Sequence, residues 1–315
     1  QGQEGYANAE IEPVWELDEE TKEAEVTFFV EPNNRVYVRR INFRGVSEVE
    51  DEVFRREMRQ MEGAYLSNLL VDRSKVRLQR LNYLGSVEIN MEKVPDSLDE
   101  VDLNINVTER FSGNLQIGLG YSEVQGAVLN LGFAHENIFG TGNEVEFVFN
   151  NSKASEQYVF NYENPDYTPE GVSRGFNFRL TQTDSGLNNT SNYLIDQFRF
   201  SIDYGIPLSE YNRLRLEIGV LENDLMTTDG SSDEVYEFVI ANSDEYDENT
   251  PKSEIDGDTY LTLFSVLSFA KDTRNRRIFA DSGALNSISL EVHGGDLDFY
   301  KARYRHQTAL SLIHI

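Results

Sequence analysis

The chain has 315 residues, of which 55 are acidic and 28 basic, and its net charge is −27. Phosphate binding depends on dense Lys and Arg, so this balance argues against a DNA- or RNA-binding protein. The lack of cysteine excludes disulfides, zinc–thiolate sites and cysteine nucleophiles. No apolar run approaches the roughly 18 residues of a membrane-spanning helix, but a barrel strand needs only about 9–11 residues of alternating polarity.

The first segment predicts a β-hairpin. Ala9–Leu17 and Ala24–Glu31 have strand character and flank the turn Asp18-Glu19-Glu20-Thr21. No helical pattern accompanies them, so we expect residues 1–32 to be the C-terminal part of a module whose beginning is missing. The chain opens on Gln1-Gly2-Gln3 without a Met or a signal peptide, and we expect that its natural N-terminus has been lost.

Residues 33–110 mix strand and helix patterns and predict one compact α+β module. The predicted elements, in the order β-α-α-β-β, are Arg35–Arg44, Glu50–Met61, Ser67 to about Leu81, Ser86–Lys93 and Glu100–Glu109. Acidic residues at the start of the first helix suit the helix dipole, and Ser67 is the expected N-cap of the second. A unit of about 75 residues can hold one small core.

Apolar spacing predicts which side chains form that core. On the first strand, Val36 and Val38 share one face, and the register reverses after Arg39-Arg40. The expected core positions are Val36, Val38, Ile41, Phe43, Val53, Phe54, Met58, Met61, Leu70, Leu78 and Leu81.

From Gly113 onward the sequence shows strand patterns only. About ten segments alternate between an apolar, aromatic face and a face of Asn, Gln, Arg, Glu, Thr and Gly. The direction of Thr259–Phe269 stays open because both of its faces are apolar. A soluble sandwich also alternates, but its strands usually have about 5–6 residues, and several segments here are longer. Residues 111–310 therefore predict the N-terminal part of an antiparallel transmembrane β-barrel.

The connections between these segments fit a barrel. The expected inner turns are moderate in length, at Asn137–Gly142, Asn164–Ser173, Gly205–Asn212 and Lys271–Gly283. The longest connection, Asp224–Gly257, falls on the outer side and carries eleven acidic residues against Lys252 alone. It lacks the spacing and the glycine of an EF-hand, so we expect a solvated loop rather than a calcium site.

No motif predicts an enzyme, a cofactor or a metal site. Gly140-Thr141-Gly142 lies between two strands, which indicates a tight turn and not a phosphate loop. The histidines are far apart and lack metal-ligand spacing, and no nucleophile elbow is present. The four histidines are His135, His293, His306 and His314.

Two features suggest a function. The predicted helices carry clustered cations, which either dock an acidic partner or lipid headgroups or form an ordinary solvated face. These cations are Arg55, Arg56, Arg59, Arg73, Arg77 and Arg80. The other feature is the first barrel strand, Gly113–Tyr121, which has Gly118 and Gly120 in its interior. Interior glycines indicate either a weakly held edge or a closely packed site on the polar face.

Several runs resemble the BamA family of bacterial outer-membrane β-barrel assembly factors. Arg35–Gly45 and Arg55–Ala64 resemble the last POTRA domain of that family, a periplasmic module. Other runs resemble the family's periplasmic barrel turns: Asn137–Asn143, Asn164–Thr168, Gly171–Gly175, Asp272–Asn275 and Asp281–Gly283. The resemblance implies a POTRA module over 33–110, part of a preceding POTRA domain over 1–32, and the N-terminal portion of an outer-membrane barrel over 111–310.

The chain departs from the family in length. The family has a string of POTRA domains, a sixteen-strand barrel and a Val-Arg-Gly-Phe motif in a later loop, which this sequence does not contain. Ten strands cannot reproduce that closure, so we expect an open sheet with free edges at Gly113–Tyr121 and Tyr300–Leu310. Residues 311–315 do not resemble a closing strand, and we expect a tail of foreign or truncated origin.

The resemblance also implies a function. It predicts a protein that folds and inserts β-barrel clients into the outer membrane without being an enzyme. Client strands would pair with the first barrel strand, through Asn114, Leu115, Gln116, Ile117, Gly118, Leu119, Gly120 and Tyr121. Arg55, Arg59 and Glu62 are the implied docking residues for a periplasmic lipoprotein subunit. The alternatives are a secretion or translocation pore of the same superfamily, a passive porin and, less in keeping with the motifs, a hydrolase.

Overall fold

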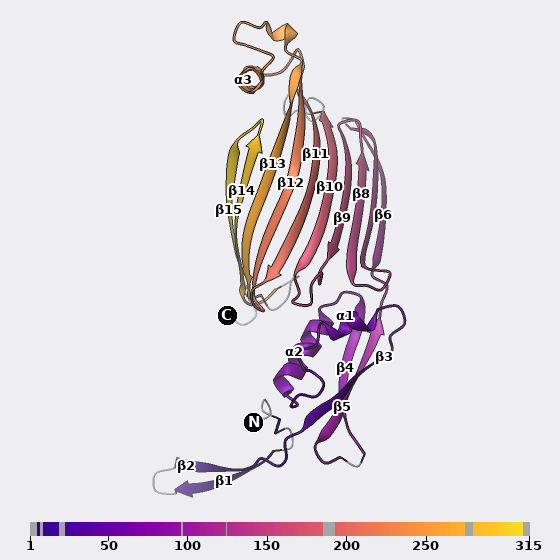
Figure 1. The fold of residues 1–315 in the computed structure, drawn as a ribbon, viewed down its shortest axis with the longest axis vertical. Helices are drawn as coiled ribbons and strands as arrows, with labels where there is room; N and C mark the ends of the chain where they lie inside the picture. Colours follow the sequence, from indigo (N-terminus) through magenta and orange to yellow (C-terminus); the bar gives the residue numbers. More distant parts are fainter. Residues whose placement is uncertain are drawn as a thin grey trace. The chain divides into compact units, whose positions relative to one another are not determined.

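The computed structural model of the chain describes residues 5–6, 9–18, 23–95, 97–123, 125–184, 193–274 and 280–310. It divides into two compact units (Figure 1). One unit comprises Gln1–Ser112 together with the turn Phe139–Gly142, and the other comprises Gly113–Ile138 and Asn143–Ile315. The predicted tail at 311–315 lies outside the described residues, as do parts of the turns at 19–22 and 275–279 and residue 96.

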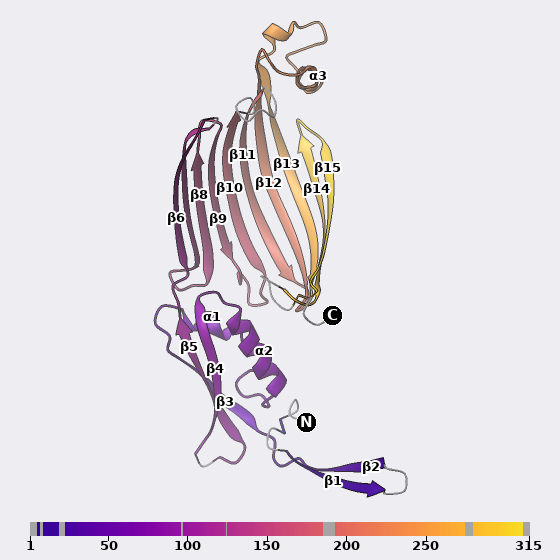
Figure 2. The ribbon, with the colours of Figure 1, turned by 180° about the vertical axis from the view of Figure 1, so that it is seen from behind.

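The first unit contains the predicted β-α-α-β-β module. Its elements are β3 (Tyr37–Arg44), α1 (Asp51–Arg55), α2 (Asn68–Gln79), β4 (Leu84–Lys93) and β5 (Glu100–Glu109). The sheet order is β3-β5-β4, with β3 parallel and β4 antiparallel to β5, and Figure 2 shows the two helices on one side of this sheet. Parallel pairing of β3 with the last strand needs a long crossover, which the two helices and β4 provide.

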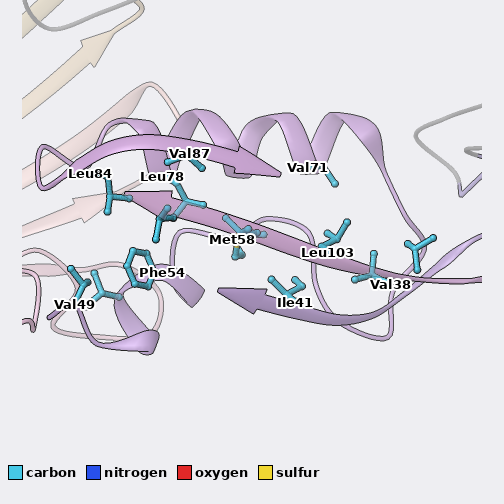
Figure 3. Packing of buried hydrophobic residues seen from close by; sticks show 14 of the residues in the cluster. Val38, Ile41, Val49, Phe54, Met58, Val71, Leu78, Leu84, Val87 and Leu103 are labelled. Atoms are coloured by element: carbon cyan, nitrogen blue, oxygen red, sulfur yellow. The ribbon is translucent and has the colours of Figure 1, made fainter. Parts of the chain in front are cut away.

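The module's core lies between its sheet and its helices (Figure 3). Val38 is 0% exposed and Ile41 is 4% exposed, although their spacing would put them on opposite faces of a regular strand. An irregularity in the pairing of β3 with β5 between Val38 and Arg40 shifts the register and turns both side chains inward. The predicted reversal of register after Arg39-Arg40 is therefore a β-bulge.

The first helix is shorter than predicted. The stripe over Glu50–Met61 suggested three turns, but α1 ends at Arg55. The backbone N–H groups of Arg59 and Gln60 donate to the Ser74 hydroxyl of α2, at 2.8 and 3.2 Å, and not to helix carbonyls. Met61 consequently leaves the apolar stripe and is 60% exposed. The second helix agrees with its prediction, because Ser67 caps α2 by accepting the N–H of Leu70.

The N-terminal hairpin also forms as predicted. Its strands are β1 (Glu10–Asp18) and β2 (Glu23–Glu31), paired antiparallel with Ile11 opposite Val30 and Trp15 opposite Val26. These two strands form a separate two-stranded sheet with exposed apolar side chains, Trp15 being 67% exposed.

The second unit is a single antiparallel sheet. Within residues 113–184, 193–274 and 280–310, ten strands follow one another in sequence order from β6 to β15. They are β6 (Gly113–Ser122), β7 (Gly126–Ile138), β8 (Asn143–Asn151), β9 (Ser155–Asn164), β10 (Ser173–Asp184), β11 (Tyr193–Pro207), β12 (Asn212–Thr227), β13 (Gly257–Asp272), β14 (Ala284–Gly295) and β15 (Phe299–Thr308). No helix among the described residues is long and apolar enough to cross a membrane.

The structure settles the direction of β13. Leu261, Leu263 and Leu267 are 47%, 70% and 49% exposed, whereas Tyr260 and Phe264 are 2% exposed. The leucines therefore lie on the exposed, apolar face of this sheet, and Tyr260 and Phe264 point to the opposite face. Large apolar residues occur on both faces of β13 because Tyr260 and Phe264 are buried by neighbouring side chains on the polar face.

A glycine permits that packing. A Cβ atom at Gly219 would lie 2.6 Å from the Phe264 ring and 2.4 Å from a backbone oxygen, so only glycine leaves the ring its place. The guanidinium of Arg199 lies 3.8 Å from the centre of the Phe264 ring, and the His293 ring stacks against Phe264 and Phe299. Arg199 and this row of three rings join strands β11 to β15 on the polar face.

The long acidic connection is partly folded, contrary to the expectation of strands and a solvated loop. It contains α3 (Asp233–Asn242) and the 3-10 turn η1 (Lys252–Glu254). Tyr236 and Val239 lie three residues apart on one helix face and pack with Ile255 into a small buried cluster. The sequence analysis did not detect this short helical repeat of apolar residues, because acidic residues dominate the connection.

Glu109 organises the loop before α1. Its carboxylate accepts the backbone N–H groups of Ser47, Glu48 and Val49 at 3.0 to 3.1 Å and the Ser47 hydroxyl at 2.5 Å. Burial raises the pKa of Glu109, but these hydrogen bonds outweigh burial and hold the pKa below its ordinary value.

This environment predicts a pH-dependent contribution to stability. Because the pKa is lowered by folding, the contribution is present above the ordinary pKa of about 4.3 and is lost as pH falls through the folded value. Glu109→Gln should lower the opening free energy of the module's amides by about 1–3 kcal/mol at neutral pH. Hydrogen exchange at neutral and acidic pH should show this difference from wild type shrink in acid; a constant difference would contradict the assignment.

A second prediction concerns the core. Leu103 is fully buried at the centre of β5, so Leu103→Ala should lower the opening free energy of the module by about 2–5 kcal/mol. The matched control is Leu98→Ala, because Leu98 is 89% exposed and its truncation should change stability by less than about 0.5 kcal/mol. Hydrogen exchange of module peptides in the full chain measures both, and equal effects would show that the core is placed wrongly.

Candidate functional site

The first barrel strand is an edge of the sheet. Strand β6 pairs with β7 from Gly113 opposite His135 to Ser122 opposite Gly126, and in the described part of the chain no strand pairs with its other side. Strand β15 forms the opposite edge and pairs only with β14 among the described strands. The expected open sheet with two free edges is confirmed, although β15 ends at Thr308 and not at Leu310.

The apolar side chains of β6 are exposed. On its apolar face, Leu115, Ile117, Leu119 and Tyr121 are 70%, 64%, 81% and 80% exposed. Interior strands range from 37% at Phe133 of β7 to 70% at Leu263 of β13, so exposure alone does not distinguish β6. The remaining candidate positions, on the polar face of the same strand, are Asn114, Gln116, Gly118 and Gly120. All eight predicted residues thus lie on one edge strand.

The interior glycines of β6 do not serve close packing. A Cβ atom at Gly118 would make contacts of 3.4 Å or more with Asn130, and one at Gly120 would reach Val128 at 4.0 Å. Larger residues would fit at both places within the described structure. Of the two explanations left open by the sequence, a crowded polar face is therefore not supported by the described structure.

Backbone geometry divides the donors of β6 into two sets. In an antiparallel pair, residues in hydrogen-bonded pairs direct both N–H and C=O to the partner strand, and the intervening residues direct theirs away. Residues of one parity in β6 therefore bond β7, and those of the other parity face the open edge. An extended segment arriving at this edge would find a complete ladder of donors and acceptors.

The structure brings two of the three predicted docking residues together. A guanidinium nitrogen of Arg55 lies 3.4 Å from the Glu62 carboxylate, and Arg55 also bonds Asp51. Glu62 accepts the backbone N–H of Ile41 at 2.7 Å, which ties it to β3. Arg59 is half-buried, and its guanidinium approaches the carbonyl oxygens of its own turn at 3.4 Å. Arg55 and Glu62 are thus presented as an exposed pair, and Arg59 is directed inward.

The cationic surface is smaller than the sequence suggested. Arg77 forms an ion pair with Glu57 at 2.8 Å, so its charge is balanced inside the module. Arg73 and Arg80 remain exposed on α2. The sequence analysis missed the exposure of Met61, which precedes Glu62 in the chain. Its position in the apolar stripe predicted burial, and no other feature of the sequence indicated that it is exposed.

Family models match both units of the chain. Residues 137–314 match the Omp85 superfamily domain, and residues 36–110 match the POTRA model, described as surface antigen variable number repeat. The second match coincides with the β3-α1-α2-β4-β5 module. The first covers most of the ten-strand sheet.

Curated relatives agree with these families. The chain is 28% identical over 311 residues to the outer membrane protein assembly factor BamA of Neisseria meningitidis, covering 96% of this chain and 38% of that protein. It is 26% identical over 301 residues to BamA of Buchnera aphidicola, covering 90% of this chain and 46% of that protein. The chain therefore spans less than half the length of these two relatives.

Solved structures show the same fold. BamA of Haemophilus ducreyi lacking POTRA domains 1–3 superposes with a TM-score of 0.69 at 27% identity, covering 96% of this chain and 57% of that one. CdiB of Acinetobacter baumannii gives 0.52 at 11% identity, covering 96% and 53%, which is a likeness of fold alone. The POTRA module is periplasmic and the sheet lies in the outer membrane. Since the matching domain model covers more than half of its residues, the chain belongs to the Omp85 superfamily.

Proposed function

We propose that this chain is part of a non-enzymatic factor that folds and inserts β-barrel proteins into the outer membrane. The observation that carries the proposal is that β6 begins the sheet, pairs only with β7 among the described strands, and holds interior glycines that packing against β7 does not require. A strand of an unfolded client would add to this edge by β-augmentation. Its hydrogen bonds are to the main chain, so clients of many sequences can pair in the same way.

The relatives' names support the same function. Proteins named outer membrane protein assembly factor match 90% or more of this chain at 26–28% identity. A secretion pore of the same superfamily has weaker support, since the CdiB likeness concerns the fold alone. A passive porin would have no use for a POTRA module with an exposed ion pair. No cofactor enters the proposal, because strand pairing needs only backbone groups.

The proposed partners follow from the two surfaces. Unfolded outer-membrane proteins pair with β6, and a periplasmic lipoprotein subunit docks on the module at Arg55, Arg59 and Glu62. Arg55 and Glu62 support this because they are 46% and 44% exposed at the side chain and lie beside exposed Met61. Met and Arg are both enriched at protein–protein interfaces.

Proline substitution tests the strand-pairing function in the intact protein. Proline removes one N–H donor, so its effect depends on where that donor points. Gln116→Pro and Ile117→Pro alter adjacent residues whose N–H groups face opposite sides of β6. We predict that the proline on the open side abolishes client assembly in a protein whose barrel still folds. The other proline should instead weaken the β6–β7 pairing. Heat-modifiable migration shows whether the barrel itself has folded, and the yield of folded client measures client assembly.

Gln116→Ala is the matched control, because alanine keeps the donor and changes only the side chain. It should leave client assembly within about two-fold of wild type, as expected when side chains contribute little to a backbone ladder. Gly118→Pro, of the same parity as Gln116, should reproduce the Gln116→Pro result. If all three prolines were as harmless as alanine, the proposed pairing at β6 would be wrong.

A separate prediction tests the docking surface. Charge reversal by Glu62→Lys should weaken co-purification of the lipoprotein subunit, since loss of an interfacial charge pair costs about 2–5 kcal/mol. Glu62→Gln separates docking from folding, because the amide oxygen still accepts the Ile41 N–H. We expect Glu62→Gln to keep normal hydrogen-exchange protection of β3 while losing part of the co-purification. Full retention of the subunit by both variants would contradict the proposed docking site.

A further inference from the structure

One arginine stands on the lipid-facing side of the sheet. In β10, Arg174 has the same parity as Phe176, Phe178 and Leu180 and thus belongs to the apolar face. Its cross-strand neighbour on β11 is Tyr204, itself 38% exposed on that face. A cation in this position is costly in lipid unless it reaches the interface or meets a counter-charge.

The surroundings of Arg174 are aromatic. Its guanidinium lies 3.8 Å from the centre of the Tyr167 ring and 5.2 Å from that of Phe176. The Tyr167 and Tyr204 rings are 6.4 Å apart, and the Tyr162 and Phe176 rings 6.1 Å apart. These rings hold the planar guanidinium in place by cation–π contact and leave its charge uncompensated.

Arg174 has no anionic partner in the described part of the chain. No ion pair is formed between it and any described carboxylate, and its buried Nε has no hydrogen-bond partner there. By contrast, Arg199 and Arg215, on the polar face, pair with Glu217 and Asp203 at 2.9 Å. Within the described residues, the Arg174 guanidinium therefore has aromatic neighbours but no counter-ion, on the face of the sheet where an unpaired charge is costly.

The height of Arg174 in the membrane follows from strand direction. Strand β6 starts four residues after β5, the last strand of the periplasmic module, so β6 runs away from the periplasmic side. Neighbouring strands are antiparallel, and β10 therefore also starts at the periplasmic end. Arg174 is its second residue and adjoins the turn 165–172. This is the level of lipid headgroups, where aromatic girdles of barrels also lie.

We propose that Arg174 and the rings of Tyr167, Phe176 and Tyr204 form a binding site for the phosphate of a phospholipid in the periplasmic leaflet. The guanidinium supplies several N–H donors in a plane, which matches phosphate oxygens, and the rings contact the upper acyl chains. A phospholipid fits this site better than a protein anion, because the site opens on the lipid-facing side of the sheet. The inference is independent of strand pairing at β6.

Lipid competition on the full-length protein tests the site. The protein is equilibrated with vesicles containing equal amounts of phosphatidylglycerol and a glycosyl diacylglycerol, which has similar chains but no phosphate. The ratio of the two lipids retained is then read by native mass spectrometry. Arg174→Gln should lower the preference for phosphatidylglycerol about five-fold, the value expected for one cation near a lipid surface. Arg174→Lys should lose part of this preference, since it keeps the charge but not the planar donors.

Arg179→Gln is the matched control. Arg179 lies on the same strand, but its odd parity places it on the polar face, where it is exposed. Its loss should leave the lipid preference unchanged. Heat-modifiable migration shows that each variant has folded, and Arg174→Lys preserves the test if Arg174→Gln does not fold. An unchanged preference in folded Arg174 variants, an equal loss with Arg179→Gln, or release of the lipid by excess inorganic phosphate would each overturn the proposal.

Discussion

Inside a membrane, each backbone N–H and C=O group needs a hydrogen-bond partner, and a sheet that does not close on itself leaves one side of each outer strand without one. In this chain the constraint acts on β6 and β15, which bound the ten strands described. An edge strand in lipid therefore needs a partner strand, from its own chain or from another. In the proposed function, a client strand would supply this partner for β6.

Side-chain packing on the polar face differs from one part of the sheet to another. Between β11 and β15 the polar face carries the ladder of Arg199, Phe264, His293 and Phe299, and Gly219 is needed to admit the Phe264 ring. Strand β6 has glycines too, but its glycines admit no such ring. Ring contacts also join β8 to β9, through Phe149 and Tyr158, and β9 to β10, through Tyr162 and Phe176.

Much of this architecture could be predicted from the sequence, because period-2 alternation and turn residues are local signals. Alternation located the ten strands, and Ser67 located the start of α2. Features that depend on contacts between distant residues could not be found in this way. The Ser74 hydroxyl accepts the N–H of Arg59 in the segment that follows α1, and the α3 cluster requires Ile255 to return to Val239. The candidate edge was identified by position, whereas the inward direction of Arg59 and the exposure of Met61 needed the fold.

The most direct measurement of the central claim is position-resolved crosslinking at the edge strand. Single cysteines placed from Asn114 to Gly120 in the intact protein would be tested for disulfides with cysteines in the terminal strand of a stalled client. Antiparallel or parallel pairing fixes a register, so the account predicts crosslinks that shift by one residue on β6 for each residue moved on the client. Cysteines on the interior strand β9, such as Phe160→Cys, should give none. Crosslinks without a register, or no crosslink on β6 while the client still assembles, would contradict strand pairing at this edge.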